Sequence, residues 1–383
     1  MEIKQVYELV NTATSEVIGD SAVVAEDLSN IVDVGEAIFN ASAFDAYVRT
    51  LVNHIGKVIF VNRPYRGSAP SVLMDAWEYG SVVEKITSEM PQAVENESWE
   101  LEDGASYDPH VFHKPVAEAK FFNKMTTFEI EASITERQVK QSFSSATQLN
   151  AFISMIFNEI DKAMTVRTDS LIMRTINNMI LETAKDATAH SGSPRSVNLL
   201  SEYNTKFSKS LTAGVAIYDP EFIRYAALRL ALYTDRMTRM STLFNVGGKQ
   251  RFTPKDLQHI VMLSEFKAAA DIYLQSDTFH DEYTKLVGAE TIPFWQGSGT
   301  DYEFTSTGKV YGEPASGNSG SAITASGVLA CIFDRDALGV MNNNQRVTTQ
   351  YNPKAEFTNY FYKKDARYFN DLNENFVFFY VAS

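Results

Sequence analysis

The chain is poor in features that would mark it as a secreted or membrane protein. It has one cysteine among 383 residues, Cys331, so no disulfide can form within the chain. Cys331 lies in the apolar run GVLACIF, which favours a buried structural thiol over a nucleophile. No apolar run approaches the ~18 residues of a membrane span, and no leader precedes the first helical pattern. We therefore expect an intracellular protein in a reducing compartment.

Positive charge is also scarce. The chain has 34 Lys and Arg against 48 Asp and Glu, a formal net charge of −14. A dedicated nucleic-acid binder gains affinity by neutralising phosphates, so this balance argues against that class, although it would let packed DNA pass without sticking. The 44% hydrophobic content predicts a large core in two or three substructures, and the 12% aromatic content is typical of extensive subunit contacts.

No motif for nucleotide binding or nucleophilic catalysis is complete. Gly248-Lys249 and Gly308-Lys309 each lack the first glycine of a phosphate-binding loop at the required spacing. Segment 317–320, GNSG, lacks the spacer residue of a nucleophile elbow. The histidines are scattered singly and offer no convincing triad. The sequence therefore predicts no cofactor and no catalytic turnover.

Two groups of residues resemble metal ligands only superficially. His110 and His113 lie between prolines, so they cannot present both rings from one helix face as a zinc site requires, and ordinary loop histidines are the better interpretation. Asp334 and Asp336 flank an arginine at the end of an apolar run, a pattern more typical of a hydrogen-bonded turn with a local ion pair than of a cation site. We expect no metal.

Residues 63–118 form a long acidic insert rich in turn-forming residues. A loop of this length is unusual inside a compact domain. Apolar segments predict strands before it (58–62) and after it (117–122 and 127–134), so we expect a long β-hairpin arm. Six carboxylates and no Lys or Arg occupy its middle: Glu95, Glu97, Glu100, Glu102, Asp103 and Asp108. They fit a solvated or docking face better than a glycosidase pair, because nothing fixes their separation.

The longest regular pattern covers residues 144–185. Apolar residues recur there at helical spacing, Ser145 and Gln148 form a capping-box pattern, and no Pro or Gly interrupts the run. The pattern predicts a helix of roughly 60 Å. Its heptad register is not sustained and its apolar positions fall on one stripe, so we expect it to lie along a sheet or neighbouring segments rather than in a coiled coil.

The remaining patterns mix helices and strands. Asp219-Pro220 provides an N-cap and first-turn proline for a helix to about residue 240. Further patterns predict short helices at 6–10, 28–39, 264–274 and 278–287, strands at 259–263, 327–333, 357–362 and 376–381, and a surface loop at 297–320. The order implies an α+β protein whose middle segment alternates as in an α/β domain.

Five stretches resemble tailed-phage major capsid proteins of the Hong Kong 97-like fold, and above all those of short-tailed phages with protein-primed linear genomes. In chain order they are VGEAIFNASAFDAYVRTLVNHIGKVI (34–59), GSVVEKI (80–86), FSSATQLNAFISMIFNEI (143–160), ACIFDRDALGV (330–340) and YNPKAEFTNYFYKKDARY (351–368). The resemblance implies an N-terminal arm (1–55), an extended hairpin loop (56–134), a peripheral domain with the spine helix (135–205), an axial domain (206–350) and a returning C-terminal strand (351–383).

The resemblance further implies a structural protein that assembles into an icosahedral shell around double-stranded DNA. Expected partners are other copies in hexamers and pentamers, scaffolding and portal proteins, and DNA bound without sequence specificity; the expected location is the virion, after assembly in the host cytoplasm. We expect the acidic insert to meet basic residues of a neighbour, namely Arg137, Lys140, Arg167 and Arg174. The alternatives are an encapsulin-like compartment shell and a glycoside hydrolase that uses the acidic insert.

Overall fold

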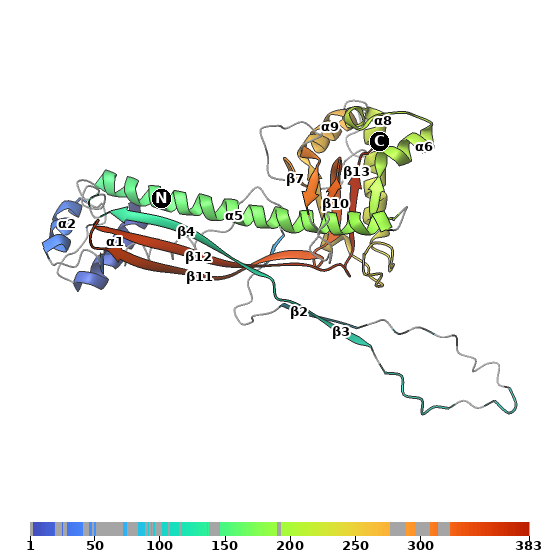
Figure 1. Ribbon diagram of the computed structural model, residues 1–383, viewed down its shortest axis with the longest axis horizontal. Helices are drawn as coiled ribbons and strands as arrows, with labels where there is room; N and C mark the ends of the chain where they lie inside the picture. Colours follow the sequence, from blue (N-terminus) through green and yellow to red (C-terminus); the bar gives the residue numbers. More distant parts are fainter. Residues whose placement is uncertain are drawn as a thin grey trace.

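The fold is organised along one long helix, α5 (Ala146–Ala189) (Figure 1). A four-stranded sheet runs along this helix, a five-stranded sheet stands at its C-terminal end, and an arm projects away from both. The computed structural model describes residues 3–19, 29–40, 72–74, 83–88, 102–105, 108–114, 116–135, 146–189, 193–275, 289–295, 307–312 and 322–382, with residues 25, 46, 47, 50, 91, 93, 95 and 137. The α+β class predicted from the sequence is confirmed.

Helix α5 has 44 residues, which at ~1.5 Å per residue gives a rod of about 66 Å. The predicted helix is confirmed, and its proposed cap Ser145 lies outside the described residues. Buried threonines satisfy their own hydroxyls within the helix. The hydroxyls of Thr168, Thr175 and Thr183 donate to carbonyl oxygens four residues earlier, at 2.9, 2.8 and 2.8 Å.

The expectation of a single buried stripe on α5 is wrong for its second half. Residues 175–177 and 179–183 are all buried. The reason lies in the tertiary structure, which surrounds this part of the helix. Strands of both large sheets and the small hairpin of β8 (Val310–Gly312) and β9 (Ile323–Ala325) pack against this helix. The predicted surface loop at 297–320 is therefore also wrong at β8, where Val310 is fully buried.

The four-stranded sheet has the order β1 (Leu73–Met74), β11 (Leu338–Asn352), β12 (Phe357–Asn370) and β4 (Met125–Thr135). β11 and β12 form a long antiparallel hairpin, and β4 pairs with the other edge of β12. The predicted strand at 357–362 is thus the first part of a longer strand. β11 was not predicted, because most of it, residues 342–352 with the sequence NNNQRVTTQYN, is polar.

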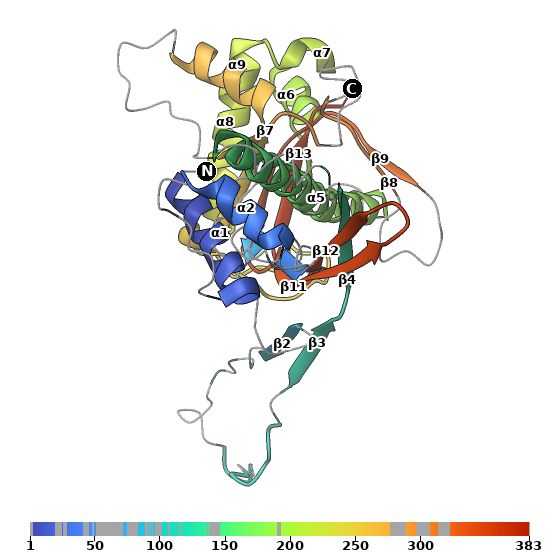
Figure 2. The ribbon, with the colours of Figure 1, turned by 90° about the vertical axis from the view of Figure 1, so that its left-hand side faces the viewer.

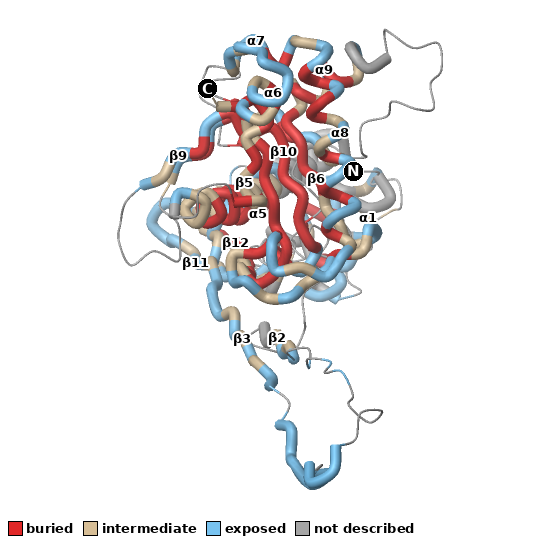
Figure 3. The backbone as a smooth tube through the Cα atoms, turned by 90° about the vertical axis from the view of Figure 1, so that its right-hand side faces the viewer, coloured by how far each residue is buried: buried red, intermediate tan, exposed pale blue. Residues whose placement is uncertain are grey.

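The five-stranded sheet holds the main core. Its order is β5 (Ser196–Asn198), β13 (Phe376–Tyr380), β10 (Val328–Asp334), β6 (Gln258–Leu263) and β7 (Glu290–Ile292). Every residue of β10 is buried, and the strands on either side of it are buried along most of their length (Figure 3). The strands predicted at 259–263, 327–333 and 376–381 are confirmed.

Helices lie at the end of the five-stranded sheet that is farthest from the arm (Figure 1). They are α6 (Leu199–Phe207), α7 (Ala213–Ala216), α8 (Pro220–Arg236) and α9 (Ser264–Gln275), with a 3₁₀ turn at Lys255–Leu257. The predicted cap of α8 is confirmed, since the Asp219 carboxylate accepts from the Phe222 amide at 2.8 Å. Helix α6 was not predicted from the sequence.

The N-terminal helices α1 (Ile3–Ile18) and α2 (Ile31–Asn40) lie near the start of α5, at the opposite end from the five-stranded sheet (Figures 1 and 2). Both were predicted, α1 over fewer residues (6–10) and α2 over a slightly longer range that begins earlier (28–39). Val10, Ala13 and Thr14 of α1 are fully buried. The strand predicted at 58–62 and the helix predicted at 278–287 lie outside the described residues.

Candidate assembly interface

The projecting arm is a ribbon of β2 (Val83–Ser88) and β3 (Ala117–Phe122) (Figure 1). The two strands pair antiparallel from Val83 opposite Phe122 to Ser88 opposite Ala117. β3 coincides with the strand predicted at 117–122 and pairs with a strand inside the insert. The pairing of the strand predicted at 58–62, which lies outside the described residues, stays a prediction. A two-stranded ribbon is marginally stable in water on its own, so its surroundings matter.

The outer face of the arm is apolar and exposed. Residues directly opposite one another in an antiparallel pair share a face, which places Ile86 beside Ala119. Ile86 and Phe121 are exposed by 68% and 63%, and Phe112 beyond the ribbon by 83%. Large apolar side chains exposed to this degree are typical of a protein contact.

The inner face of the arm is charged and held to the body. Lys85 lies opposite Lys120, a like-charge pair that would repel if unpartnered. Between them stands Asp371, whose side chain is 2% exposed, with its oxygens 3.2 Å from the Lys85 amine and 2.9 Å from the Lys120 amine. Lys85 also pairs with Glu374 at 2.7 Å, and Arg251 reaches the same carboxylate at 3.2 Å. We call these five residues the root cluster.

Electrostatics favour the ionised form of the root cluster. Burial acts to raise the pKa of Asp371, but hydrogen bonding to Lys120 and the charge of Lys85 outweigh it, so this pKa is lowered. A neighbouring pair acts in the same direction: Lys249 lies 2.8 Å from Glu118 of β3, and its hydrogen bond lowers the pKa of that carboxyl. The arm is thus fixed at its base by ion pairs, together with an aromatic contact between Phe122 and Phe369 of β12, whose ring centres lie 5.2 Å apart.

The acidic residues predicted as contacts lie beyond the ribbon. Glu95, Glu102 and Asp103 are exposed, whereas Glu97 and Glu100 lie outside the described residues. Asp108 is also exposed, and its carboxylate accepts from the His110 amide at 2.9 Å, a local turn interaction. The described acids of this segment are therefore on the surface, as a docking role requires.

The predicted basic contacts lie elsewhere on the chain. Arg137 and Arg167 are exposed, and Lys140 lies outside the described residues. Arg174 is exposed but already engaged: its guanidinium donates to the Tyr368 hydroxyl at 3.0 Å and lies 5.2 Å from that ring's centre. The fold does not bring α5 to the distal part of the arm (Figure 1). Within one chain, the fold therefore does not bring the described acids of the insert close to the described basic residues of α5.

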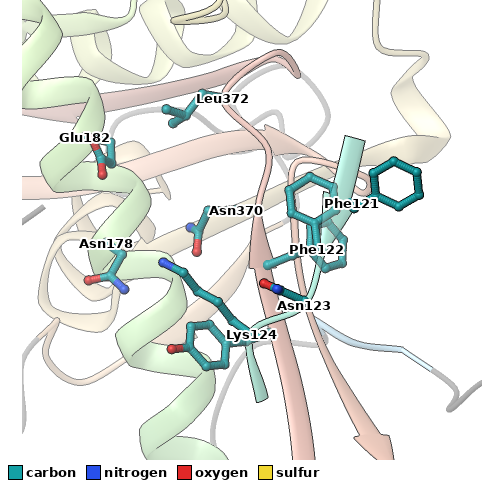
Figure 4. A pocket seen from close by; sticks show the side chains of 10 residues that line it. Phe121, Phe122, Asn123, Lys124, Asn178, Glu182, Asn370 and Leu372 are labelled. Carbon is teal, nitrogen blue, oxygen red and sulfur yellow. The ribbon is translucent and has the colours of Figure 1, made fainter. Parts of the chain in front are cut away.

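A pocket of about 180 Å³ opens where the arm leaves the body. Figure 4 shows Lys124 at the β3–β4 corner, Asn178 and Glu182 on α5, and Asn370 with Leu372 on the strand and turn opposite. Four of its lining residues are apolar: Phe121, Phe122, Phe369 and Leu372. Phe121 belongs both to this pocket and to the apolar outer face, so the two surfaces are continuous.

A second exposed apolar surface lies on α8. Leu228 and Leu232, one helical turn apart, are exposed by 53% and 38%. The sequence contains the signal for it, since these leucines fall outside the buried stripe of Phe222, Ile223, Ala226 and Leu230. The prediction of a helix here accounted only for the buried face.

The described residues provide little for catalysis. They contain no cluster of His, Cys, Asp and Glu able to hold a metal ion. Cys331 is buried, and burial raises its pKa, which disfavours the reactive thiolate. The predicted turn at Asp334 is confirmed, with its carboxylate accepting from the Asp336 amide at 2.8 Å and from the Thr253 hydroxyl at 2.7 Å. Among the described helices, none is long and apolar enough to cross a membrane.

One family model matches nearly the whole chain. The family model described as Phi29-like phage major capsid protein matches residues 8–380. No curated protein matches the chain. The capsid structure of Staphylococcus phage Andhra is similar at a TM-score of 0.52 and 10% identity, over 84% of this chain and 86% of that one. A bacteriophage P68 structure (head fiber and inner core protein gp22) has a TM-score of 0.44 at 11% identity, over 81% and 83% of the two chains.

Proposed function

The chain belongs to the Phi29-like phage major capsid protein family, and from that premise we propose which of its surfaces join the subunits. It is a structural protein of the icosahedral capsid of a bacteriophage, assembled from its own copies. Membership in this family implies a non-enzymatic role and a location in the virion. Neither the compartment-shell alternative nor the hydrolase alternative is favoured by the family.

The arm is the surface that reaches a neighbouring subunit. On its apolar outer face Ile86 and Phe121 are more than half exposed, and among the described residues no third strand pairs with either strand of the ribbon. A neighbour that covers this face would remove apolar surface from water and stabilise the ribbon. In this proposal residues 56–134 form the overlapping arm, 1–55 the N-terminal arm, 135–205 the peripheral domain, 206–350 the axial domain and 351–383 the returning strand.

The acidic segment of the arm docks on a basic patch of the adjacent subunit. Six carboxylates without a Lys or Arg among them repel one another, so positive partners lower their energy. Arg137, Lys140, Arg167 and Arg174 are the proposed partners. One exposed pair contributes only about 0–1 kcal/mol, but the contact recurs in every subunit and salt should weaken it.

Charge reversal tests this docking. Glu102→Lys/Asp103→Lys should impair shell assembly more than folding, and adding Arg137→Glu/Arg167→Glu should partly restore assembly. Glu36→Lys/Asp256→Lys reverses two exposed acids outside the arm and controls for the change in net charge. Electron microscopy and sedimentation measure shells, and circular dichroism measures folding. Normal assembly of the arm variant, or a combined variant no better than the single reversal, would show that the segment is merely solvated.

The shell encloses double-stranded DNA and does not recognise its sequence. The net charge of −14 supports a wall along which DNA moves without sticking. Assembly takes place in the host cytoplasm with scaffolding and portal proteins as partners. Purified heads should contain DNA, while the free protein should bind a DNA duplex no more tightly than serum albumin does at physiological salt.

A further inference from the structure

The pocket at the root of the arm has dimensions suited to an aromatic ring. We propose that it receives the Phe112 side chain of a second copy of this chain, an inference that rests on the proposed overlap of the arm with a neighbour. A cavity of about 150 Å³ lined by apolar side chains is large enough to bind benzene. At about 180 Å³ the pocket accommodates a phenyl ring.

Phe112 is suited to this role by its exposure. At 83% it is the most exposed large apolar side chain among the described residues. Leaving a phenyl ring in water costs free energy that burial recovers, and aromatic residues are frequent anchors at the centres of interfaces. The chain therefore has both an exposed phenyl ring, Phe112, and a pocket large enough to bury one.

The charges of the segment and of the pocket are complementary. The pocket carries one acid, Glu182, and one base, Lys124, beside its apolar wall. The exposed segment 108–114 carries an acid at one end, Asp108, and a base at the other, Lys114. With Phe112 seated, Lys114 can approach Glu182 while Asp108 approaches Lys124, so each end meets its opposite charge.

The occupant is a second copy because the chain's own Phe112 is far from its own pocket. The arm extends away from the body, and segment 108–114 lies near its far end (Figures 1 and 2). The root cluster, including Asp371 between Lys85 and Lys120, fixes the base of the arm in this direction. Phe121 belongs both to the apolar outer face and to the pocket. A neighbour's arm that packs along that face therefore also contacts the pocket.

Disulfide trapping tests the contact directly. The variant His113→Cys/Asn123→Cys keeps the Phe112 ring and places one thiol beside it on the segment and one on the exposed rim of the pocket. After assembly in reductant and mild oxidation with copper phenanthroline, a gel without reductant should show a ladder of linked chains, because a disulfide needs Cα atoms within roughly 4.4–6.8 Å. His113→Cys/Val32→Cys, whose second site is exposed on α2 near the start of α5 and therefore far from the pocket-lining residues of that helix, is the matched control. A ladder no stronger than the control overturns the proposal.

A truncation provides the second readout. Phe112→Ala should raise the protein concentration needed for half-maximal assembly about 10- to 100-fold, the factor expected for losing one buried phenyl ring. Val116→Ala, which shortens a 52% exposed side chain on the same arm, should change it less than about threefold. Equal effects of the two substitutions would overturn the proposal. Wild-type protein that builds no shell would refute the proposed function as well, whereas normal shells without the ladder refute only this inference.

Discussion

The free energy of opening the arm should depend on which charge of the root cluster is removed, and not only on how many ion pairs are lost. Asp371 is 2% exposed, whereas Lys85 and Lys120 are 21% and 38% exposed. Removing the lysines leaves a buried carboxylate without its cations, which costs about 3–5 kcal/mol when no compensation remains. Removing the carboxylate instead lets Lys120 return to water and leaves Lys85 with Glu374 at 2.7 Å.

The expected magnitudes follow from this asymmetry. Asp371→Asn should lower the free energy of arm opening by about 1–2 kcal/mol, since the lost pairs are partly exposed. Lys85→Met/Lys120→Met should lower it by about 3 kcal/mol, because the Asn373 amide, 3.1 Å from the Asp371 carboxylate, still compensates part of the charge. Adding Asp371→Asn to the double lysine variant removes the stranded charge and should restore part of the loss.

Hydrogen exchange of the β3 amides measures this opening. At a protein concentration too low for assembly, 1.4 kcal/mol corresponds to about a tenfold change in protection. Protection should therefore fall about tenfold in Asp371→Asn and about a hundredfold in the double lysine variant, with recovery in the triple. If the triple variant is no better protected than the double, a stranded charge is not the cause and the electrostatic argument fails.

The pH dependence of arm opening has a definite sign. The pKa of Asp371 is lowered in the folded state, so its contribution is fully present above the ordinary carboxyl value of about 4. It is lost as the pH falls through the lowered pKa. Protection of β3 should therefore stay constant through neutral pH and fall only in acid, and Asp371→Asn should abolish the part of the acid response that this carboxyl causes.

Three further predictions concern the backbone at two glycines, the cap of α8 and the burial of Cys331. Gly327→Ala, at a φ of 67° and facing the Val381 carbonyl, should lower the unfolding free energy in urea by at least ~2 kcal/mol, whereas Gly248→Ala, at a φ of 64° in open space, should cost only about 1 kcal/mol. Asp219→Ala should cost about 1 kcal/mol in the same assay through loss of the α8 cap. Cys331, whose pKa burial raises, should resist a thiol reagent at pH 8 until the protein unfolds. A cysteine labelled at once in the native protein would contradict its burial.

The sequence by itself determined the elements whose signal is local. Residues 144–185 contain no Pro or Gly and repeat apolar residues at helical spacing, so α5 could be predicted to within a few residues at each end. Asp219-Pro220 encodes the start of α8 through its own cap. The apolar run at β10 and the exposure of the described insert acids were likewise evident, since a continuous apolar run must be buried and a cluster of like charges must be solvated.

Only the tertiary structure decided which segments pair and which charges meet. β2 and β11 are mixed or polar in sequence and become strands because a partner satisfies their backbone groups: β3 for one, β12 for the other. Lys85, Lys120 and Asp371 lie far apart along the chain, and nothing local couples the arm to the turn after β12. Residues 175–177 and 179–183 of α5 are all buried because strands of both large sheets pack around them, a fact that periodicity along one helix cannot encode. Local chemistry specifies local conformation, whereas pairing and burial depend on distant residues that share one region of space.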